Sequence, residues 1–180
     1  MSKLIEVEEL RDETKLKSFM ERLKTLTDFI GIESSILPVS ADINVEQLIL
    51  SLSDDNDTMQ IMFITDMFAN DKDSVILQLI SSLSIVAGEK NIVELAALIA
   101  RVNPILPVGS FGITGADNLY MRQTIMAKSK ELIDLAIVVE TIDIMTIFIN
   151  LIGSNLRLFI EDKISFEQCL IKVQEFITPR

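Results

Sequence analysis

The chain has no histidine at all and only one cysteine, Cys169, among its 180 residues. The lack of histidine excludes catalytic triads and acid–base steps that use an imidazole, and it removes most protein zinc sites. A single cysteine excludes an internal disulfide, which fits a reducing cytoplasm. Because Cys169 lies in an apolar helical pattern with no histidine to activate it, we expect a buried and inert thiol.

Basic residues are scarce as well. The chain has 16 Lys and Arg against 27 Asp and Glu, which gives a net charge of -11 and a pI near 4.4. Charge of this sign repels the phosphate backbone and anionic lipids, so we expect neither nucleic acid nor a membrane as partner. Two explanations stay open, namely plain acidic solubility and a preference for a basic or aggregation-prone polypeptide.

Targeting and membrane segments are not expected either. The N-terminal residues contain no apolar run of signal-peptide length, which predicts a cytoplasmic location. The stretch Leu132–Ile152 has about the length of a membrane span, but it contains Asp134, Glu140 and Asp143. Each central acid costs about 2.5–3.5 kcal/mol on membrane insertion. We therefore expect a buried helix of a soluble protein.

Apolar residues, in contrast, are abundant. They make up 49% of the chain, its mean hydropathy is +0.40, and its length suits one domain with a proper core. Residues 12–30 are predicted to form a helix that ends at Gly31, because apolar residues recur there at spacings of three and four. This apolar stripe consists of Leu16, Phe19, Met20, Leu23, Leu26 and Ile30.

Three short apolar runs predict strands at 47–53, 59–66 and 75–86. Acidic turns separate them, at residues 54–57 and 70–73, so we expect an antiparallel meander. Segment 33–44, which contains Pro38, is expected to be a connection. Both faces of the meander carry apolar residues, so either helices cover both faces or one face binds a partner. Met62 and Ile64 are the candidate partner-binding residues on the second face.

A helix is predicted from Asn91 to Asn103, followed by a β-hairpin over residues 108–126. Arg122 is the only charged residue in the second hairpin strand. We expect it to pair with an acid on a neighbouring element, and it is also a candidate for docking a partner, together with Tyr120.

Neither the glycines nor the acids of these turns indicate a ligand. Gly109, Gly112 and Gly115 are evenly spaced but lack the lysine and Ser/Thr of a phosphate-binding loop, and residues 54–57 lack the glycine and distant glutamate of a calcium loop. We expect no cofactor, no metal and no enzymatic activity.

Residues 129–152 are predicted to form a helix that is apolar nearly all round, and such a helix must be buried on every side. A second subunit can provide part of that burial, which makes Ile137, Ile144 and Phe148 candidate dimer-interface residues. A bend or break is expected at Gly153. A capping box at 165–168 then predicts a last helix, so that residues from about 154 to 180 form a helical extension.

The stretch from Asn103 to Arg122 carries a family resemblance, through Asn103, Leu106–Gly112 and Asp117–Arg122. Together with the order of elements over residues 12–150, it resembles the type III secretion chaperone-like fold, including YbjN-like and Tir-chaperone-like bacterial domains. The resemblance implies an acidic, dimeric, cytoplasmic protein without a catalytic site, whose apolar surfaces hold an extended segment of another polypeptide. The extra C-terminal helices, Leu156–Ile177, depart from the compact chaperones and could cover the surface that chaperones use for clients.

These observations predict one α+β domain over residues 1–180. An antiparallel sheet, made of a three-strand meander plus a hairpin, packs with helices in the order α-β-β-β-α-β-β-α, followed by the C-terminal helices. The predicted function is a non-enzymatic, polypeptide-binding chaperone-like or regulatory protein that acts as a homodimer. The alternative is a dimeric structural or regulatory domain with no client polypeptide.

Overall fold

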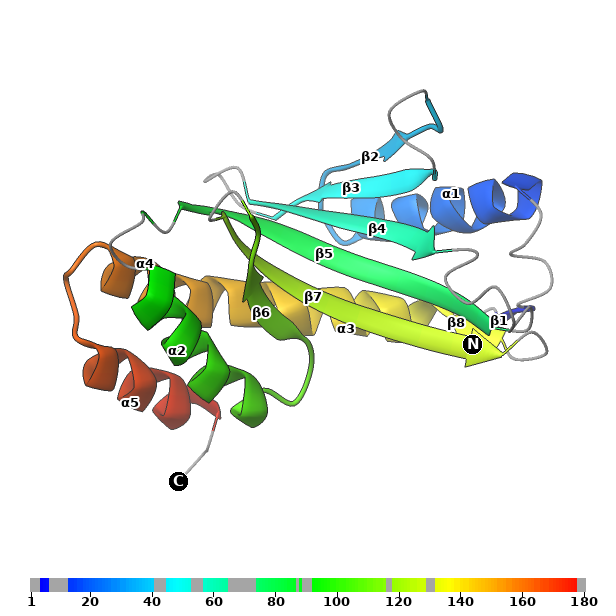
Figure 1. Cartoon of the computed structure of the whole chain (residues 1–180). Coiled ribbons are helices and arrows are strands. Elements are labelled where there is room, and N and C mark those ends of the chain that lie inside the picture. Colours follow the sequence, from blue (N-terminus) through cyan, green and yellow to red (C-terminus); the bar gives the residue numbers. More distant parts are fainter. Residues whose placement is uncertain are drawn as a thin grey trace. The chain divides into compact units, whose positions relative to one another are not determined.

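The computed structural model describes residues 4–6, 13–40, 45–52, 57–64, 74–86, 88, 92–115, 118–128 and 132–177. It is an α+β protein with a six-stranded antiparallel sheet in the order β2-β3-β4-β5-β7-β6 and a separate pair formed by β1 and β8 (Figure 1). The predicted fold class is therefore confirmed.

The helices and strands follow the chain in this order: β1 (Leu4–Glu6), α1 (Glu13–Phe29), β2 (Ser34–Leu37), β3 (Gln47–Ser51), β4 (Thr58–Ile64), β5 (Ser74–Val86), α2 (Ile92–Val102), the 3-10 turn η2 (Asn103–Ile105), β6 (Ser110–Ile113), β7 (Asn118–Lys128), β8 (Leu132–Asp134), α3 (Leu135–Phe148), the π-helical segment η3 (Ile149–Gly153), α4 (Ser154–Ile160) and α5 (Phe166–Ile177).

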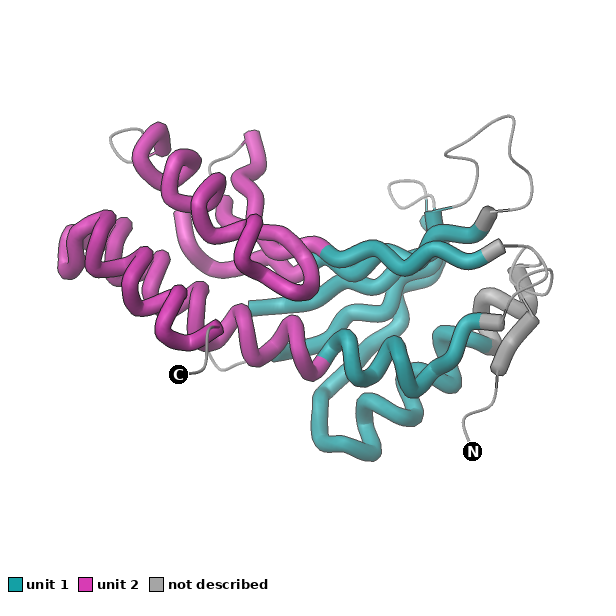
Figure 2. Tube along the Cα trace, turned by 90° about the horizontal axis from the view of Figure 1, so that it is seen from below, with its two compact units in different colours: residues 1–80, 123–142 teal, residues 81–122, 143–180 magenta. Residues whose placement is uncertain are grey.

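The chain forms two compact units, each assembled from two separate stretches of sequence (Figure 2). Unit 1 consists of residues 1–80 and 123–142, and unit 2 of residues 81–122 and 143–180. The boundaries fall inside β5, β7 and α3, so none of these elements belongs to one unit alone.

The core of unit 1 lies between α1 and one face of β3 and β4. Alternate strand residues point to this face because the side-chain period of a strand is two. Leu48 pairs with Ile61 and Leu50 with Met59, and all four side chains are buried. Phe19 of α1 meets Phe63 of β4 edge to face, with ring centroids 5.0 Å apart. Helix α1 thus uses Phe19, Met20 and Leu23 for the core, whereas Leu26 and Ile30 of the predicted stripe are exposed.

The meander of unit 1 has one strand more than we predicted. Segment 33–44 was expected to be a connection, but Ser34–Leu37 forms β2 and pairs antiparallel with β3. The strand has only four residues and lies at the edge of the sheet. So short a run, with two serines and a following Pro38, gives almost no periodic pattern, and its partner strand stabilises it.

The helix predicted from residue 129 begins later, at Leu135. Residues 132–134 form β8 instead, and they pair with β1, a segment for which no strand was predicted. The side chain of Asp134 ends the strand and starts the helix, because its Oδ1 accepts a hydrogen bond of 2.8 Å from the backbone N–H of Ala136. The apolar run thus contains a capping residue that periodicity alone does not reveal.

In unit 2 the side chain of Asn103 joins the end of α2 to the hairpin. Its Nδ2 donates to the carbonyl of Phe111 at 3.0 Å, and its Oδ1 accepts from the N–H of Phe111 at 2.8 Å. Phe111 pairs with Met121 across β6 and β7, and both side chains are buried. One amide group therefore sets the position of β6 relative to α2.

The helix does not break at Gly153, which was one of the two outcomes predicted there, a bend or a break. The chain continues from α3 through η3 into α4, and the π-helical segment brings Gly153 against β5. A Cβ atom at this position would lie 2.8 Å from Cδ2 of Leu83, so glycine permits a close approach of helix and strand.

The predicted capping box at the start of α5 is confirmed. The N–H of Ser165 donates to Oε1 of Gln168 at 2.8 Å, and the N–H of Gln168 donates to Oγ of Ser165 at 3.2 Å. The cap predicted at Asn91 and the acidic turn residues 54–56 and 70–73 lie outside the described residues.

The Asn103 linkage yields a prediction on stability. Asn103→Ala leaves the backbone N–H and carbonyl of Phe111 without their side-chain partner, so we expect the free energy of unfolding to fall by about 1–3 kcal/mol. Urea unfolding followed by circular dichroism measures the change. The control Gln174→Ala, at an exposed position on α5, should change it by less than about 0.5 kcal/mol. An equal effect of both substitutions would contradict this role of Asn103.

Candidate interaction surfaces

Among the described residues, no group of three or more His, Cys, Asp or Glu side chains is placed to hold a metal ion. Cys169 is buried, and its Sγ lies 3.5 Å from the carbonyl oxygen of Asn155. Burial raises the pKa of this thiol to about 11, partly offset by the positive charge of Lys172. The thiol is therefore protonated at neutral pH and a poor nucleophile.

The strands of unit 1 have one covered and one open face. Helix α1 and the part of α3 in this unit lie on the same side of the strands (Figures 1 and 2). The register places Leu37, Gln47 and Met62 together on the opposite side. We call this side the open face. Register and alternation place Ser35, Leu37, Gln47, Ile49, Gln60, Met62 and Ile64 on it. We assign Gln78, Ile80, Thr124 and Met126 to it from their exposure at alternate positions of β5 and β7.

The named residues of the open face are uncharged, six of the eleven are apolar, and all are at least partly exposed. Met62 and Ile64, the predicted partner-binding residues of this unit, are each partly exposed. Met126 is 61% exposed and Leu37 is exposed at the edge strand. Successive residues of these strands therefore point to opposite faces. One face is buried against helix α1, and the other remains partly exposed to water.

The other two predicted partner-binding residues, Tyr120 and Arg122, lie on β7 in unit 2. The Tyr120 ring lies directly against Gly112 of β6, where any larger residue would collide with it. Arg122 is exposed opposite Ser110. The acidic partner predicted for Arg122 is not found in the part of the chain that the structure describes. The predicted role of Arg122 in docking stays a prediction.

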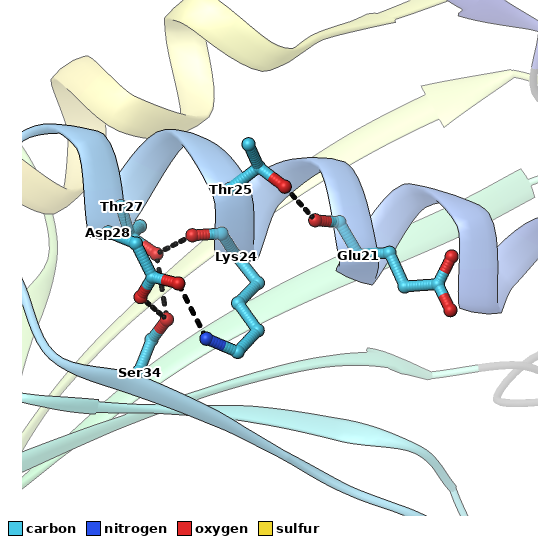
Figure 3. A network of polar contacts seen from close by, with 6 residues as sticks. All are labelled: Glu21, Lys24, Thr25, Thr27, Asp28 and Ser34. Carbon is cyan, nitrogen blue, oxygen red and sulfur yellow. Dashed lines mark hydrogen bonds and ion pairs between the residues drawn. The ribbon is translucent and has the colours of Figure 1, made fainter.

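A polar network fixes the turn between α1 and β2 (Figure 3). Lys24 Nζ donates to Asp28 Oδ2 and Ser34 Oγ donates to Asp28 Oδ1, each at 2.6 Å. The buried Thr27 hydroxyl lies 3.1 Å from Ser34 Oγ and 2.9 Å from the Lys24 carbonyl. The hydrogen bonds from Lys24 and Ser34 lower the pKa of Asp28 below its usual 3.8.

Gly31 ends α1 in the manner predicted. Its φ of +86° is left-handed, and the N–H groups of Gly31 and Ile32 donate to the carbonyls of Asp28 and Thr27, which is a Schellman motif. The Phe29 side chain beside this turn is 88% exposed.

Helix α3 carries the three predicted dimer-interface residues, but it does not present them alike. Ile137 is 54% exposed and Ile144 is exposed too, whereas Phe148 is only 7% exposed. Phe148 packs edge to face against Phe176 of α5, with ring centroids 6.5 Å apart. The helix is thus not buried on every side of this chain. Helix α5, near the C-terminus of the chain, covers Phe148, and this contact between α3 and α5 was not predicted.

The continuous helical run Leu135–Ile160 has 26 residues and is long and apolar enough, by length and composition, to cross a membrane. Core helices of soluble proteins pass the same test, and 44% of its most apolar window is buried within the protein. Taken with the charged residues Glu140 and Asp143, it has the character of a helix of a soluble globular domain.

Several apolar residues that are exposed in the structure were not predicted as candidate interface residues. On α3 and η3 these are Ile147 and Leu151, which continue the exposed side of Ile144. Spacings of three and four relate them to Ile144, so a helical-wheel count that allowed an exposed apolar stripe would have found them. Phe29 and Met126 give no such pattern, because their exposure depends on a turn and on the strand face.

The Asp28 network predicts a pH-dependent stability. The pKa of Asp28 is lower in the folded protein than in the unfolded chain, so its contribution is present above pH 3.8 and is lost as the pH falls through the folded pKa. Urea unfolding at pH 7 should show the wild type to be more stable than Asp28→Asn, and the difference should shrink progressively as the pH falls below 3.8. The control is Glu33→Gln, an exposed acid on the same turn, which should show a smaller difference at pH 7. A difference for Asp28→Asn that does not depend on pH would contradict the network.

Burial of the Cys169 thiol predicts slow alkylation. At pH 8 the native protein should react with iodoacetamide at least about 10-fold more slowly than the urea-unfolded chain, because both access and thiolate formation are suppressed. Mass spectrometry of timed samples measures the rates. Equal rates for native and unfolded protein would show that the thiol is accessible.

The described residues thus expose apolar side chains on the open face of unit 1 and on α3 and η3. In comparisons with known proteins, the sequence matches no family model and no curated protein.

Proposed function

We propose that the protein is a non-enzymatic, polypeptide-binding protein that acts as a cytoplasmic chaperone or regulator. The observation that supports this proposal is the open face of unit 1. It combines apolar and neutral polar residues that water reaches, and none of its residues named above carries a charge. Apolar surface that remains in contact with water is a common feature of sites that bind other proteins.

The three glutamines of the open face support an extended polypeptide as the ligand. Gln47, Gln60 and Gln78 are partly exposed and lie among apolar residues. Each primary amide offers two N–H donors and a carbonyl acceptor, which match the backbone groups of an extended chain whatever its sequence. The apolar residues between them, Ile49 and Met62 among others, accept side chains of varied shape, and methionine adapts well to such a role.

The net charge of -11 supports the same proposal. A strongly acidic protein stays soluble while it exposes apolar surface, and it attracts basic segments of unfolded polypeptides over a range of about 10 Å at moderate salt. The same charge disfavours nucleic acid. This combination also agrees with the resemblance of Asn103–Arg122 to the type III secretion chaperone-like fold.

A dimeric structural or regulatory domain without a client is the second candidate. The apolar residues exposed on α3, Ile144 and Ile147, favour it. Homodimerisation does not exclude polypeptide binding, because the open face of unit 1 is a separate set of residues.

The proposal is tested with a variant of the open face. Met62→Glu combined with Ile64→Glu places two carboxylates among its apolar residues, and we expect loss of the polypeptides that the wild type enriches from lysate of the native host, as read by mass spectrometry. Peptides from an enriched protein, measured by isothermal titration calorimetry, should bind the variant at least about 10-fold more weakly.

The matched control is Ala97→Glu combined with Ala100→Glu. These two positions are exposed on α2, so the control adds the same charge outside the open face. The control should bind as the wild type does, and all three proteins should have similar circular dichroism spectra. Equal enrichment by the wild type and the Met62/Ile64 variant would refute the proposal.

A further inference from the structure

Strand β6 ends the six-stranded sheet on the side of β7. The edge of a sheet presents backbone N–H and C=O groups that can pair with a strand of another molecule. The N–H of Thr114 donates to the carbonyl of Asn118 at 2.9 Å, which fixes the hydrogen-bonding pattern of the hairpin. Counted in steps of two from Thr114, the even-numbered residues of β6 bond to β7, so Phe111 and Ile113 turn their backbone groups outward.

The sequence around this edge carries little of the usual protection. Charged side chains and prolines are the common means by which proteins prevent an edge strand from pairing with other molecules. No charged residue occurs between positions 102 and 116, and Pro104 and Pro107 precede the strand without lying in it. Uncharged segments rich in apolar residues pair readily with other strands when they are exposed at an edge.

The side-chain amide of Asn103 occupies the outward groups of Phe111. Its Nδ2 donates to the carbonyl of Phe111 at 3.0 Å, and its Oδ1 accepts from the N–H of Phe111 at 2.8 Å. A residue of an antiparallel partner strand would offer the same donor and the same acceptor. Asn103 begins the turn η2 at the end of α2, and its carbonyl accepts from the N–H of Leu106 at 3.2 Å. The amide is therefore held in place by a helix and its turn.

We infer that Asn103 closes the edge of β6 to strands of other molecules, above all to β6 of another copy of the chain. The strand has four residues and turns only Phe111 and Ile113 outward, so occupation of Phe111 leaves an incoming strand one position to pair with. Another copy is the partner to exclude because it brings an identical uncharged segment, and identical segments pair well with one another. This role is independent of polypeptide binding at the open face of unit 1.

Two substitutions separate this role from the contribution of Asn103 to stability. Asn103→Ala and Asn103→Lys both remove the two hydrogen bonds to Phe111, so both should lower the urea midpoint of unfolding by a similar amount. Lysine places a charge at the edge, whereas alanine leaves the edge open. Under native conditions, Asn103→Ala should form thioflavin-T-positive aggregates at least about 10-fold faster than Asn103→Lys.

The matched control is Val173→Ala, at a buried position on α5. It destabilises the protein through a cavity and leaves the bonds to Phe111 in place. Compared at conditions that give the same native fraction, it should aggregate as slowly as Asn103→Lys. If Asn103→Ala aggregates no faster than Asn103→Lys, or no faster than Val173→Ala, the inference is wrong.

A measurement on the wild type tests the inference without any variant. Among the described residues, none accepts a hydrogen bond from the outward N–H of Ile113. Amide hydrogen exchange followed by NMR should therefore show the N–H of Phe111 exchanging at least about 10-fold more slowly than that of Ile113. Similar exchange rates at the two positions would show that Asn103 does not hold the edge, and they would overturn the inference as well.

Discussion

The structure depends on the two-residue period of its strands, because this period decides which apolar residues leave water. In β4 the odd-numbered residues Met59, Ile61 and Phe63 are buried, and the even-numbered residues are only partly covered. A shift of one residue in register would exchange the two sets. Since both sets contain large apolar side chains, the hydrophobic effect alone does not choose between them. The helix that packs on one side makes the difference, through Phe19 against Phe63.

This dependence explains why the sequence predicted some elements well. The strands at β3, β4 and β5 and the helices α1 and α2 were placed to within about two residues, since each has a clear apolar period between polar or glycine boundaries. The capping box at Ser165 was recognised because its geometry is local, involving residues only three apart. Local chemistry and long periodic patterns are what a single sequence encodes directly.

The remaining elements depend on distant partners. Ser34–Leu37 is a strand only because β3 lies beside it, and Leu132–Asp134 only because β1 does. Phe148 was expected at a dimer interface because a helix apolar on all sides needs cover from somewhere. Phe176, about thirty residues later in the chain, covers the Phe148 side chain. The sequence of α3 alone cannot predict this contact, because the partner lies in another helix. The exposed part of the predicted interface, Ile137 and Ile144, stays a prediction.

The chain also shows how an acidic protein can expose apolar surface in two different ways. The open face of unit 1 has glutamines between its apolar residues. In unit 2, the apolar residues exposed on α3 and η3 are Ile144, Ile147 and Leu151. Neutral polar groups tolerate many orientations of a bound chain, and on this basis we propose an extended polypeptide as the ligand of the open face.

Gly153 adds a constraint on how this sequence can vary. The helix backbone at this position approaches the methyl group of Leu83 so closely that no Cβ fits between them unless one side moves. Two positions seventy residues apart therefore share one small volume. In any variant that keeps the same distance between η3 and β5, a side chain added at position 153 requires the Leu83 side chain to move or to become smaller, so the residue tolerated at one position depends on the residue at the other.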